Sequence, residues 1–281
     1  MSIVLRRLGE AGLRSILHAQ DGIREPSEEA EQDPLFVQAV ARTVQVLSAF
    51  HSASKPMSLN EIAAASGVGK SATQRVVATL RHLGYVERDP DDNGYVPGIR
   101  LLDHTLDYLR LNPLVARASP VLLELRRNVR ERIDLSLLDG LRLVYAARMQ
   151  SKRETFFATL VGHSVPVFCT SGGRAIMAAM SDDKVEEIIE KSDRRPFTAK
   201  TLVEPSAIRE KVLEAREAGY AVAVEEVLPG EVALGVAIRG PDGSPLAAIH
   251  VAGSLGEWEA EEFTRRFAPL AVEAARAISR Y

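Results

Sequence analysis

Residues 59–89 read LNEIAAASGVGKSATQRVVATLRHLGYVERD, and this stretch decides the fold of the first third of the chain. Apolar residues recur at three- and four-residue spacing on both sides of Gly67-Val68-Gly69, which predicts two helices. The two glycines end the first helix and permit left-handed backbone, so they predict a tight turn. In the second helix, from Lys70 to about Leu83, the residues expected to face inward are Ala72, Val76, Leu80 and Leu83, with Val77 at the margin.

The flanking sequences extend this helix pair into a larger motif. Residues 37–50, VQAVARTVQVLSAF, predict a preceding helix whose apolar residues are Val37, Val40, Val44, Leu47 and Phe50. After Gly84 the period changes to two, and two short strands around Asn93-Gly94 predict a β-hairpin. Three helices followed by a hairpin are typical of a winged helix-turn-helix, in which the last helix is the recognition helix.

The segment Gly67–Ser71 is also similar to the end of a phosphate-binding loop. A Walker A loop has a glycine five residues before its Gly-Lys pair, where this chain has Ala64. Such a loop also follows a buried strand, whereas residues 59–66 have a helical pattern. The winged helix-turn-helix is therefore favoured, and a nucleotide-binding enzyme that uses Gly69-Lys70-Ser71 is the alternative.

The polar side of the expected recognition helix has the chemistry of a DNA-binding surface, because this helix contains no Asp or Glu. Lys70 and Ser71 at its start can meet phosphates and base edges. Gln74 offers an amide fork for adenine, and Arg75 a guanidinium fork for guanine or phosphate. Arg88, on the hairpin, is placed for backbone or minor-groove contact. Two alternatives are a helical packing module with a solvated face and a sensor or scaffold that binds only protein.

Composition limits the class of protein. The chain has 281 residues, 46% of them hydrophobic, which indicates two domains with buried cores. Its one cysteine, Cys169, excludes an internal disulfide and, with no apolar run of about 20 residues, predicts a cytoplasmic protein without membrane association. The net charge is −3, yet residues 37–100 hold seven basic and five acidic side chains. Residues 1–35 are expected to form a flexible extension, since residues 20–34 are acidic and contain prolines.

The rest of the chain predicts an α+β domain. Residues 99–111 predict a helix that ends at Asn112-Pro113. From residue 114 onward, helical patterns alternate with strand patterns, including a hairpin about Asp139-Gly140 and strands between residues 220 and 253. A last helix covers residues 257–279. Helices packed against a sheet are the expected architecture.

With these motifs in place, the sequence resembles the IclR family of bacterial transcriptional regulators from about Phe36 to Ile278. The resemblance rests on residues 59–89, on YVPG (95–98), on GHSVPVFCTSGGRAIMAAM (162–180) and on GYAVAVEEVLPGEVALGVAIRGPDGSPLAAIHVAG (219–253). It implies a winged helix-turn-helix over residues 36–97, a linker helix over 98–113, and a GAF-like effector-binding and oligomerisation domain with an antiparallel sheet over 114–281.

The resemblance also implies partners and DNA-binding residues. Such proteins form homodimers or homotetramers that bind palindromic double-stranded DNA operators and respond to a small-molecule effector. The positions that match the family's DNA-binding residues are Arg42, Lys70, Ser71, Thr73, Gln74, Arg75 and Arg88.

A candidate effector site lies at CTSGGRAIMAAM (169–180). Ser171 can cap a helix there, and Gly172-Gly173 can let a small carboxylate approach the amides at the positive end of the helix. An ordinary glycine-rich helix start is the alternative. The resemblance implies that amides matching Ser171 and Gly172 line the effector pocket.

Other pocket positions implied by the resemblance have lost their polar chemistry. The family's acidic residue falls at Ala223, a frequent cysteine at Ala233, and two hydroxyl positions at His250 and Ala252. Phe156 and Phe157 match an apolar pocket wall. We therefore expect a larger, partly apolar or aromatic carboxylic acid, with its acid end at residues 171–173 and at His250. A hydrogen-bonded core histidine is the alternative for His250.

Catalysis and metal binding are not expected. No His, Cys or Asp cluster has metal-ligand spacing, and no cofactor is expected. Glu225 and Glu226 are adjacent in a predicted strand, so their carboxylates should point to opposite faces and not act as a catalytic pair.

Overall fold

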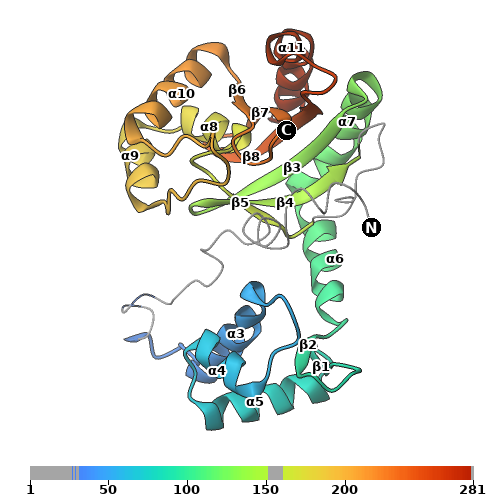
Figure 1. Cartoon of the computed structure of the whole chain (residues 1–281), viewed down its shortest axis with the longest axis vertical. Coiled ribbons are helices and arrows are strands. Elements are labelled where there is room, and N and C mark those ends of the chain that lie inside the picture. The colour runs from blue at the N-terminus through green and yellow to red at the C-terminus, as the bar shows by residue number, and fades with distance from the viewer. Residues whose placement is uncertain (1–26, 28, 30–31, 151–160, 280–281) are drawn as a thin grey trace. The chain divides into compact units, whose positions relative to one another are not determined.

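The computed structural model describes residues 27, 29, 32–150 and 161–279, and it divides into two compact units between Tyr108 and Leu109 (Figure 1). Each unit is described by itself. Helix α6, Leu101–Leu111, spans this division and lies inside the expected linker, residues 98–113. Most of the expected flexible extension, residues 1–35, lies outside the described residues.

The N-terminal unit is a three-helix motif followed by a two-stranded hairpin. Its elements are α3 (Gln38–Ser48), the short 3-10 helix η1 (Ala49–Ser52), α4 (Leu59–Ser66), α5 (Lys70–His82), β1 (Val86–Arg88) and β2 (Tyr95–Pro97). The hairpin, called the wing below, is antiparallel and pairs Glu87 with Val96. The expected winged helix-turn-helix is confirmed.

The bend between α4 and α5 follows from local signals. Ser58 and Glu61 form a capping box that starts α4, because each side chain accepts a hydrogen bond from the other residue's backbone amide. Gly67 ends α4 in the left-handed region at a φ of 68°, and Gly69 is the N-cap of α5. The glycines therefore make the turn between two helices.

Two expectations about inward faces were wrong in part. In the first expected helix, Leu47 and Phe50 pack against the core as expected, whereas Val37, Val40 and Val44 are exposed and Val46 is buried in their place. On α5 the buried residues are Thr73, Val77 and Leu80, whereas Leu83 is 51% exposed. The face expected from the apolar residues was centred one residue away from the buried face, because Thr73 was not counted as inward. A threonine whose hydroxyl is hydrogen-bonded can also lie inward.

The C-terminal unit is a six-stranded antiparallel sheet with helices on both faces, in the strand order β5-β4-β3-β8-β7-β6. The strands are β3 (Arg132–Asp139), β4 (Arg142–Met149), β5 (Ser164–Pro166), β6 (Ala221–Val224), β7 (Glu231–Arg239) and β8 (Pro245–Ser254). The helices are α7 (Pro113–Val129), α8 (Ser171–Ala178), α9 (Asp182–Lys191), α10 (Pro205–Ala218) and α11 (Ala260–Ser279).

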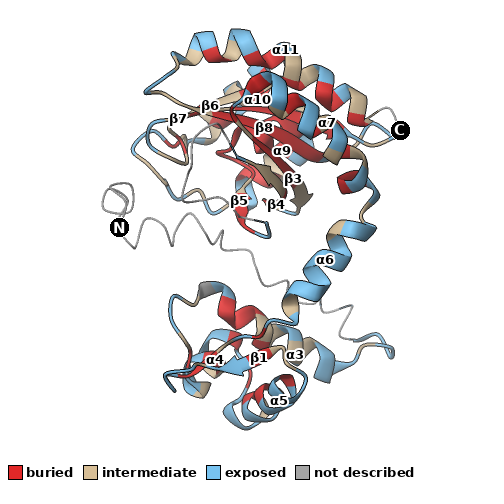
Figure 2. Ribbon diagram, turned by 90° about the vertical axis from the view of Figure 1, so that its right-hand side faces the viewer, coloured by how far each residue is buried: buried red, intermediate tan, exposed pale blue. Residues whose placement is uncertain are grey.

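The two faces of this sheet differ in chemistry. Helices α7 and α11 cover one face, which we call the apolar face, and share with it a cluster that contains Leu234, Ile249 and Phe263. Helix α8 packs on the other face, called the polar face, with α9 and α10 outside it. Figure 2 shows the central strands buried between these helix layers. The expected α+β class and antiparallel sheet are confirmed.

Candidate functional site

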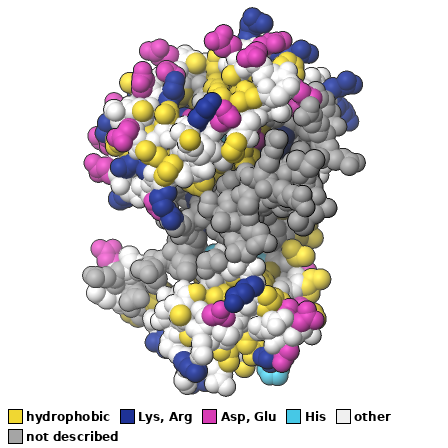
Figure 3. Space-filling view, in the orientation of Figure 1, with side chains coloured by type: hydrophobic (Ala, Val, Ile, Leu, Met, Phe, Trp, Pro, Cys, Tyr) yellow, Lys and Arg dark blue, Asp and Glu magenta, His cyan; other side chains and the backbone are white. Residues whose placement is uncertain are grey.

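The predicted recognition residues form one exposed surface on α5. Lys70 and Ser71 lie in the first turn, Gln74 and Arg75 follow one turn later, and all four side chains are exposed. We call these four residues the recognition surface. Figure 3 shows basic side chains along the edge of the N-terminal unit that α5 forms (compare Figure 1). Exposed donors on a helix without acidic residues can meet both phosphate oxygens and base edges.

Thr73 does not belong to this surface. Its side chain is fully buried, and its hydroxyl donates to the carbonyl of Val68 at 3.0 Å. This hydrogen bond ties the first turn of α5 to the glycine turn. The expected DNA contact by the Thr73 side chain is therefore corrected to a structural role.

Arg42 lies beside the turn of the helix-turn-helix. It is exposed on α3, and it lines a surface groove of about 460 Å³ together with the turn residues Gly67, Val68 and Gly69. The groove brings a basic side chain of the first helix next to the start of α5. The structure thus places Arg42 near the recognition surface.

Arg88 is held on the wing by two neighbours. Its Nε donates to Asp92 Oδ1 at 2.5 Å, and its guanidinium carbon lies 5.0 Å from the centre of the Tyr95 ring. The hydrogen bond to Asp92, followed by the interaction with Tyr95, raises the pKa of Arg88. Arg88 is exposed, and a guanidinium has five N–H donors, so it can bind a further partner from outside the protein.

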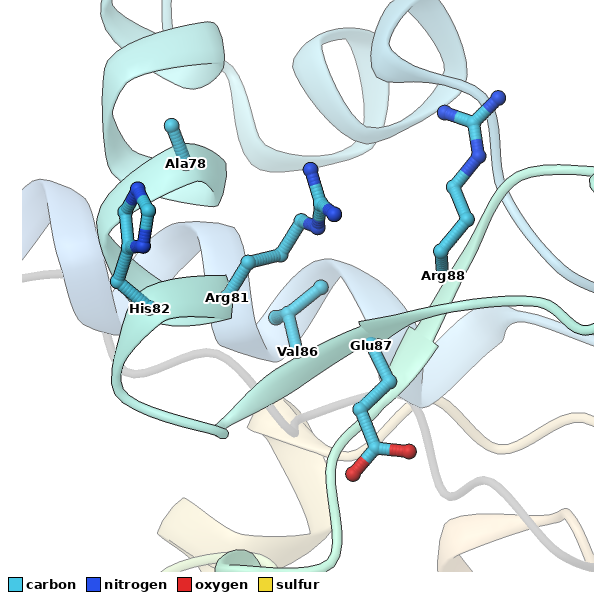
Figure 4. Close-up of a pocket in the computed structure, with 6 residues that line it drawn as sticks. All are labelled: Ala78, Arg81, His82, Val86, Glu87 and Arg88. Atoms are coloured by element: carbon cyan, nitrogen blue, oxygen red, sulfur yellow. The ribbon is translucent and has the colours of Figure 1, made fainter.

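The structure adds Arg81 and His82, which were not among the predicted site residues. The Arg81 guanidinium carbon lies 5.9 Å from the centre of the same Tyr95 ring. A groove of about 270 Å³, called the α5–wing groove below, is lined by Ala78, Arg81, His82, Val86, Glu87 and Arg88 (Figure 4). Sequence reasoning did not single out Arg81, because only the packing of the wing brings it to the same groove as Arg88.

The phosphate-binding-loop alternative is wrong. Helix α4 ends directly before Gly67, and Gly69 begins a second helix. A Walker A loop instead connects a buried strand to a helix, so that its amides surround a phosphate. The Gly-Lys-Ser sequence here is the start of a recognition helix.

In the C-terminal unit, the sheet brings three of the predicted effector residues into one row. Ala223 pairs with Ala233, Ala233 pairs with Ala252, and Ala252 pairs with Arg132. Arg132 donates to Asp134 on its own strand and, at 2.6 Å, to Glu231 on β7. The small alanine side chains allow the Arg132 side chain to cross β8, which separates the two strands.

A second row follows on the same face. Gly235, His250, Asp134 and Arg148 are neighbours across β7, β8, β3 and β4. The Asp134 carboxylate is fully buried and accepts hydrogen bonds from Arg132 and Arg148. Burial alone raises the pKa of Asp134, but the two guanidinium groups outweigh it, and the net pKa is lowered. This pair of rows places buried charges beside the start of α8.

His250 is a hydrogen-bonded core histidine. Its Nε2 lies 2.7 Å from Ser136 Oγ, and its ring is tilted against Tyr145, with ring centres 5.5 Å apart. Burial lowers the pKa of His250 to about 4, because the interior disfavours the charged imidazolium. At neutral pH His250 is therefore uncharged.

The start of α8 differs in two ways from the expectation. The N-cap is Thr170, whose Oγ1 accepts from the amide of Gly173 at 3.1 Å, and Ser171 is the first helical residue. The Ser171 hydroxyl is buried and has no hydrogen-bond partner among the residues that the structure describes. A buried hydroxyl without a partner costs about 1–3 kcal/mol, so it indicates a place where a ligand can supply the missing partner.

Gly172 and Gly173 serve close packing and do not open a path to the helix end. A Cβ atom on Gly172 would lie 2.2 Å from the His250 ring, and one on Gly173 would lie 1.9 Å from the Val167 carbonyl oxygen. On the sheet side, a Cβ on Gly235 would lie 2.2 Å from the backbone of Ser171. The glycines therefore let α8 lie directly on β7 and β8.

A buried ion pair fixes α8 to the segment after β6. Arg174 is fully buried and donates with both Nη atoms to the Glu226 carboxylate, at 2.5 and 2.6 Å. Glu225 instead pairs with Lys200 and accepts from the amide of Gly230. The two adjacent glutamates thus have separate partners, but not for the expected reason: β6 ends at Val224, so neither glutamate lies in a strand, and Glu225 adopts a left-handed φ of 56°. Sequence reasoning did not find the Arg174–Glu226 pair, because its members are 52 residues apart.

Other expected site features are settled only in part. Phe156 and Phe157 lie outside the described residues. Within residues 32–150 and 161–279, no group of three or more His, Cys, Asp or Glu side chains could hold a metal ion. None of the described helices is long and apolar enough to cross a membrane.

Comparison with known proteins finds matches to both the N-terminal and the C-terminal unit. The chain matches the IclR helix-turn-helix domain over residues 39–90 and the bacterial transcriptional regulator IclR C-terminal domain over residues 106–280. The fold and these matches define a class of DNA-binding regulators that have a ligand-binding domain. The chain belongs to the IclR family of transcriptional regulators, whose members are regulators and not enzymes.

Individual proteins show the same likeness. The chain is 29% identical to the Pca regulon regulatory protein of Pseudomonas putida over 245 residues, which is 87% of this chain and 84% of that protein. A putative transcriptional regulator from Rhodococcus sp. RHA1 has a similar structure, with a TM-score of 0.74, 27% identity and coverage of 87% and 98%. An IclR homologue from Microbacterium hydrocarbonoxydans, solved with 4-hydroxybenzoate, has a TM-score of 0.67, 24% identity and coverage of 86% and 97%.

Proposed function

We propose that this regulator acts in the cytoplasm as a homodimer or homotetramer that binds a palindromic operator. We also propose that a partly apolar or aromatic carboxylic acid, bound in the C-terminal unit, controls this binding. One observation carries the proposal. Lys70, Ser71, Gln74 and Arg75 share an exposed surface of a helix that contains no acidic residue.

The residues of the recognition surface have different roles in DNA binding, which follow from their side-chain chemistry. Lys70 and Ser71 bind phosphate and fix the register of α5 on the duplex, with Arg42 beside them. Gln74 reads adenine and Arg75 reads guanine in the major groove. The wing places Arg88 on the neighbouring backbone or minor groove. Base reading is thus assigned to two residues and positioning to the others.

Exposed apolar side chains support association with a second copy of the chain. Val37, Val40 and Val44 form a stripe along α3 and are 58%, 60% and 56% exposed. Leu102 and Leu106 lie one turn apart on α6 and are also exposed. Two-fold pairing of the N-terminal units gives two recognition helices that read half-sites related by the same symmetry, about 34 Å apart for one helical turn of DNA.

The polar face of the sheet supports a carboxylic acid as the effector. Arg132 is the charged end of the alanine row, its side chain is 21% exposed, and a guanidinium binds a carboxylate through parallel hydrogen bonds. Within the described part of the chain, the Ser171 hydroxyl lacks a hydrogen-bond partner. Ala223, Ala233 and Ala252 are small and apolar, so an apolar ligand body is better suited to this row than a polar one. A similar protein was solved with the aromatic acid 4-hydroxybenzoate, which fits this ligand class.

Effector binding would act through a shift between arrangements of the subunits. A ligand that binds one arrangement more tightly increases its population. Because half-sites fix the spacing of two recognition helices, a change in the geometry around α6 alters operator affinity. We propose α6 as the element that transmits this change.

Gel-shift titration tests the DNA-binding surface. Genome-wide footprinting first identifies the operator, and Arg75→Ala is then compared with the wild type on that operator and on single-base variants. We expect Arg75→Ala to weaken binding by about 1–3 kcal/mol and to relax the preference at one base pair. Lys55→Ala, which removes a charge outside the recognition surface, is the control. Equal binding by wild type and Arg75→Ala would reject the assignment, and no DNA binding at all would favour a protein scaffold.

Calorimetry tests the effector class. The full-length protein is titrated with benzoate, 4-hydroxybenzoate, a sugar acid and pyruvate, and then with benzamide. We expect the aromatic acids to bind most tightly, and we expect Arg132→Gln to remove the preference for benzoate over benzamide. Binding of only the smallest, most polar acids would reject a partly apolar effector.

A further inference from the structure

Two arginines from different elements share one aromatic ring at the end of the recognition helix. Arg81 comes from the last turn of α5, and Arg88 comes from β1 of the wing. Their guanidinium carbons lie 5.9 Å and 5.0 Å from the centre of the Tyr95 ring. Tyr95 is itself buried in the core of the N-terminal unit, so its ring is a fixed platform.

Two acids of the wing, Glu87 and Asp92, do not bridge the two arginines. Figure 4 shows the Glu87 side chain pointing away from Arg81 and Arg88, and its carboxylate accepts from the amide of Ile99 at 3.1 Å. Asp92 pairs with Arg88 alone, at the wing turn, and its side chain is 77% exposed. Two like charges held near one ring repel each other unless an anion lies between them.

From this geometry we infer that the α5–wing groove binds one phosphate of the DNA backbone. Arg81 and Arg88 bind its oxygens, and Tyr95 positions both side chains. The inference rests on the proposed DNA-binding role of α5 and adds Arg81 to the residues that contact DNA. Guanidinium groups suit a phosphodiester because their N–H groups match two oxygens at once.

If the α5–wing groove binds a phosphate, the recognition helix contacts the DNA backbone at both of its ends. Arg81 follows Lys70 by eleven residues, which is about 16 Å of helix or the rise of about five base pairs. A phosphate contact at each end holds the angle of α5 in the groove, and Gln74 and Arg75 then meet base edges in a fixed register. Because Arg88 is on the wing, the same phosphate also ties the wing to the helix.

A purely structural role for the pair is the competing interpretation. Arginine side chains can cover an aromatic ring with their aliphatic stems and contribute to packing alone. Methionine keeps much of this apolar stem and removes the charge. Arg81→Met and Arg88→Met therefore separate the two roles, because only phosphate binding depends on salt in the way that counterion release requires.

The experiment measures binding of the full-length protein to a mixed-sequence 30-base-pair duplex by fluorescence anisotropy between 50 and 200 mM salt. Each lost phosphate contact should lower the slope of log affinity against log salt by about one for each protomer bound. For each protomer bound, the wild type should accordingly lose about fourfold more affinity over this range than Arg81→Met, which is about sixteenfold when two protomers bind. Lys55→Met is the charge-matched control and should keep the wild-type slope.

Asp92→Asn should change DNA binding in the direction opposite to Arg81→Met and Arg88→Met. It releases Arg88 from its ion pair and removes a negative charge beside the groove, so binding should become tighter and the salt slope steeper. Tyr95→Phe keeps the ring and should keep the wild-type slope. Thermal unfolding of each variant checks that the N-terminal unit is folded.

The outcomes separate this inference from the proposed function. If Arg75→Ala weakens operator binding while folded Arg81→Met and Arg88→Met keep the wild-type slope, the groove holds no phosphate and the inference is wrong. If Arg75→Ala and Arg81→Met both bind like the wild type, the DNA-binding surface itself is misassigned. A slope reduced in Arg81→Met and Arg88→Met, but not in Lys55→Met, supports the phosphate site.

Discussion

The two faces of the C-terminal sheet are built from the same strands but follow different rules. Ile249 and His250 are neighbours on β8, yet Ile249 packs among the apolar side chains under α7 and α11, and His250 lies among buried charges under α8. Apolar contacts are not directional, so the apolar face requires only volume and shape. The polar face requires each partner at its hydrogen-bond position, because an unpaired buried charge is costly. Stability on one face therefore depends on packing, and on the other on pairing and pH.

The largest expected effect comes from breaking the buried ion pair on the α8 side. Glu226→Ala leaves the fully buried Arg174 guanidinium without its carboxylate. We expect the free energy of unfolding of the C-terminal unit to fall by about 3–5 kcal/mol. Urea unfolding at pH 7, followed by circular dichroism, measures this loss.

Two variants sharpen this result. Glu186→Ala removes an exposed partner of Arg209 and should cost less than about 1 kcal/mol. The double variant Arg174→Met, Glu226→Leu replaces the pair by apolar side chains and should recover most of the loss. A cost for Glu226→Ala no greater than that for Glu186→Ala would mean that pairing does not govern this face.

The next effect is a dependence of stability on pH. Burial lowers the pKa of His250 to about 4, below its value of about 6.5 in an unfolded chain. The unfolded state therefore binds more protons between these values, and stability falls as the pH decreases from about 6.5 to 4. The shift corresponds to about 3 kcal/mol in the free energy of unfolding. This stability is fully present above about pH 6.5 and is lost as the pH falls to about 4.

Unfolding of the wild type and of His250→Gln at a series of pH values tests whether His250 causes this pH dependence. The free energy of unfolding of the variant should change less across the window, because glutamine does not titrate. Parallel curves for the two proteins would place the pH dependence elsewhere.

Ile249, next to His250 on β8, allows a matched substitution on the apolar face. Ile249→Val removes one buried methylene and should cost about 0.5–1.5 kcal/mol. This cost should be the same at pH 5 and pH 7, because apolar side chains carry no proton. Unfolding at both values measures it, and a cost that changes with pH would show that the two faces are coupled.

The sequence could predict the N-terminal unit because its signals are local. Helix α4 covers the expected residues 59–66, and Gly67 lies in the left-handed conformation that its position implied. The hairpin likewise follows from the period of two around Asn93-Gly94. What local signals could not show was packing between elements. Thr73 faces inward because of where the turn lies, and Arg81 and Arg88 lie near the same Tyr95 ring because of where the wing lies.

The candidate effector site was less accessible to prediction. The positions Ala223, Ala233 and Ala252 came from a family resemblance, and their alignment with Arg132 depends on the register of four strands. A pattern of residues does not fix such a register. The helix start at residues 170–173 could be found from its glycines and hydroxyls, but which hydroxyl caps it depends on backbone geometry that places Thr170 first.

The smallest expected change in stability is also the most direct test of the ligand site. The Ser171 hydroxyl is buried and has no partner in residues 32–150 and 161–279, so its removal leaves none of their polar groups unsatisfied. We expect Ser171→Ala to leave the free energy of unfolding unchanged or to raise it by about 1 kcal/mol, and to weaken binding of an aromatic acid measured by calorimetry. Thr170→Ala is the matched control, because it removes the N-cap and should cost about 1 kcal/mol. A loss of stability in Ser171→Ala without any change in acid binding would make Ser171 part of the scaffold, and the polar face would then bind its ligand through Arg132 alone or not at all.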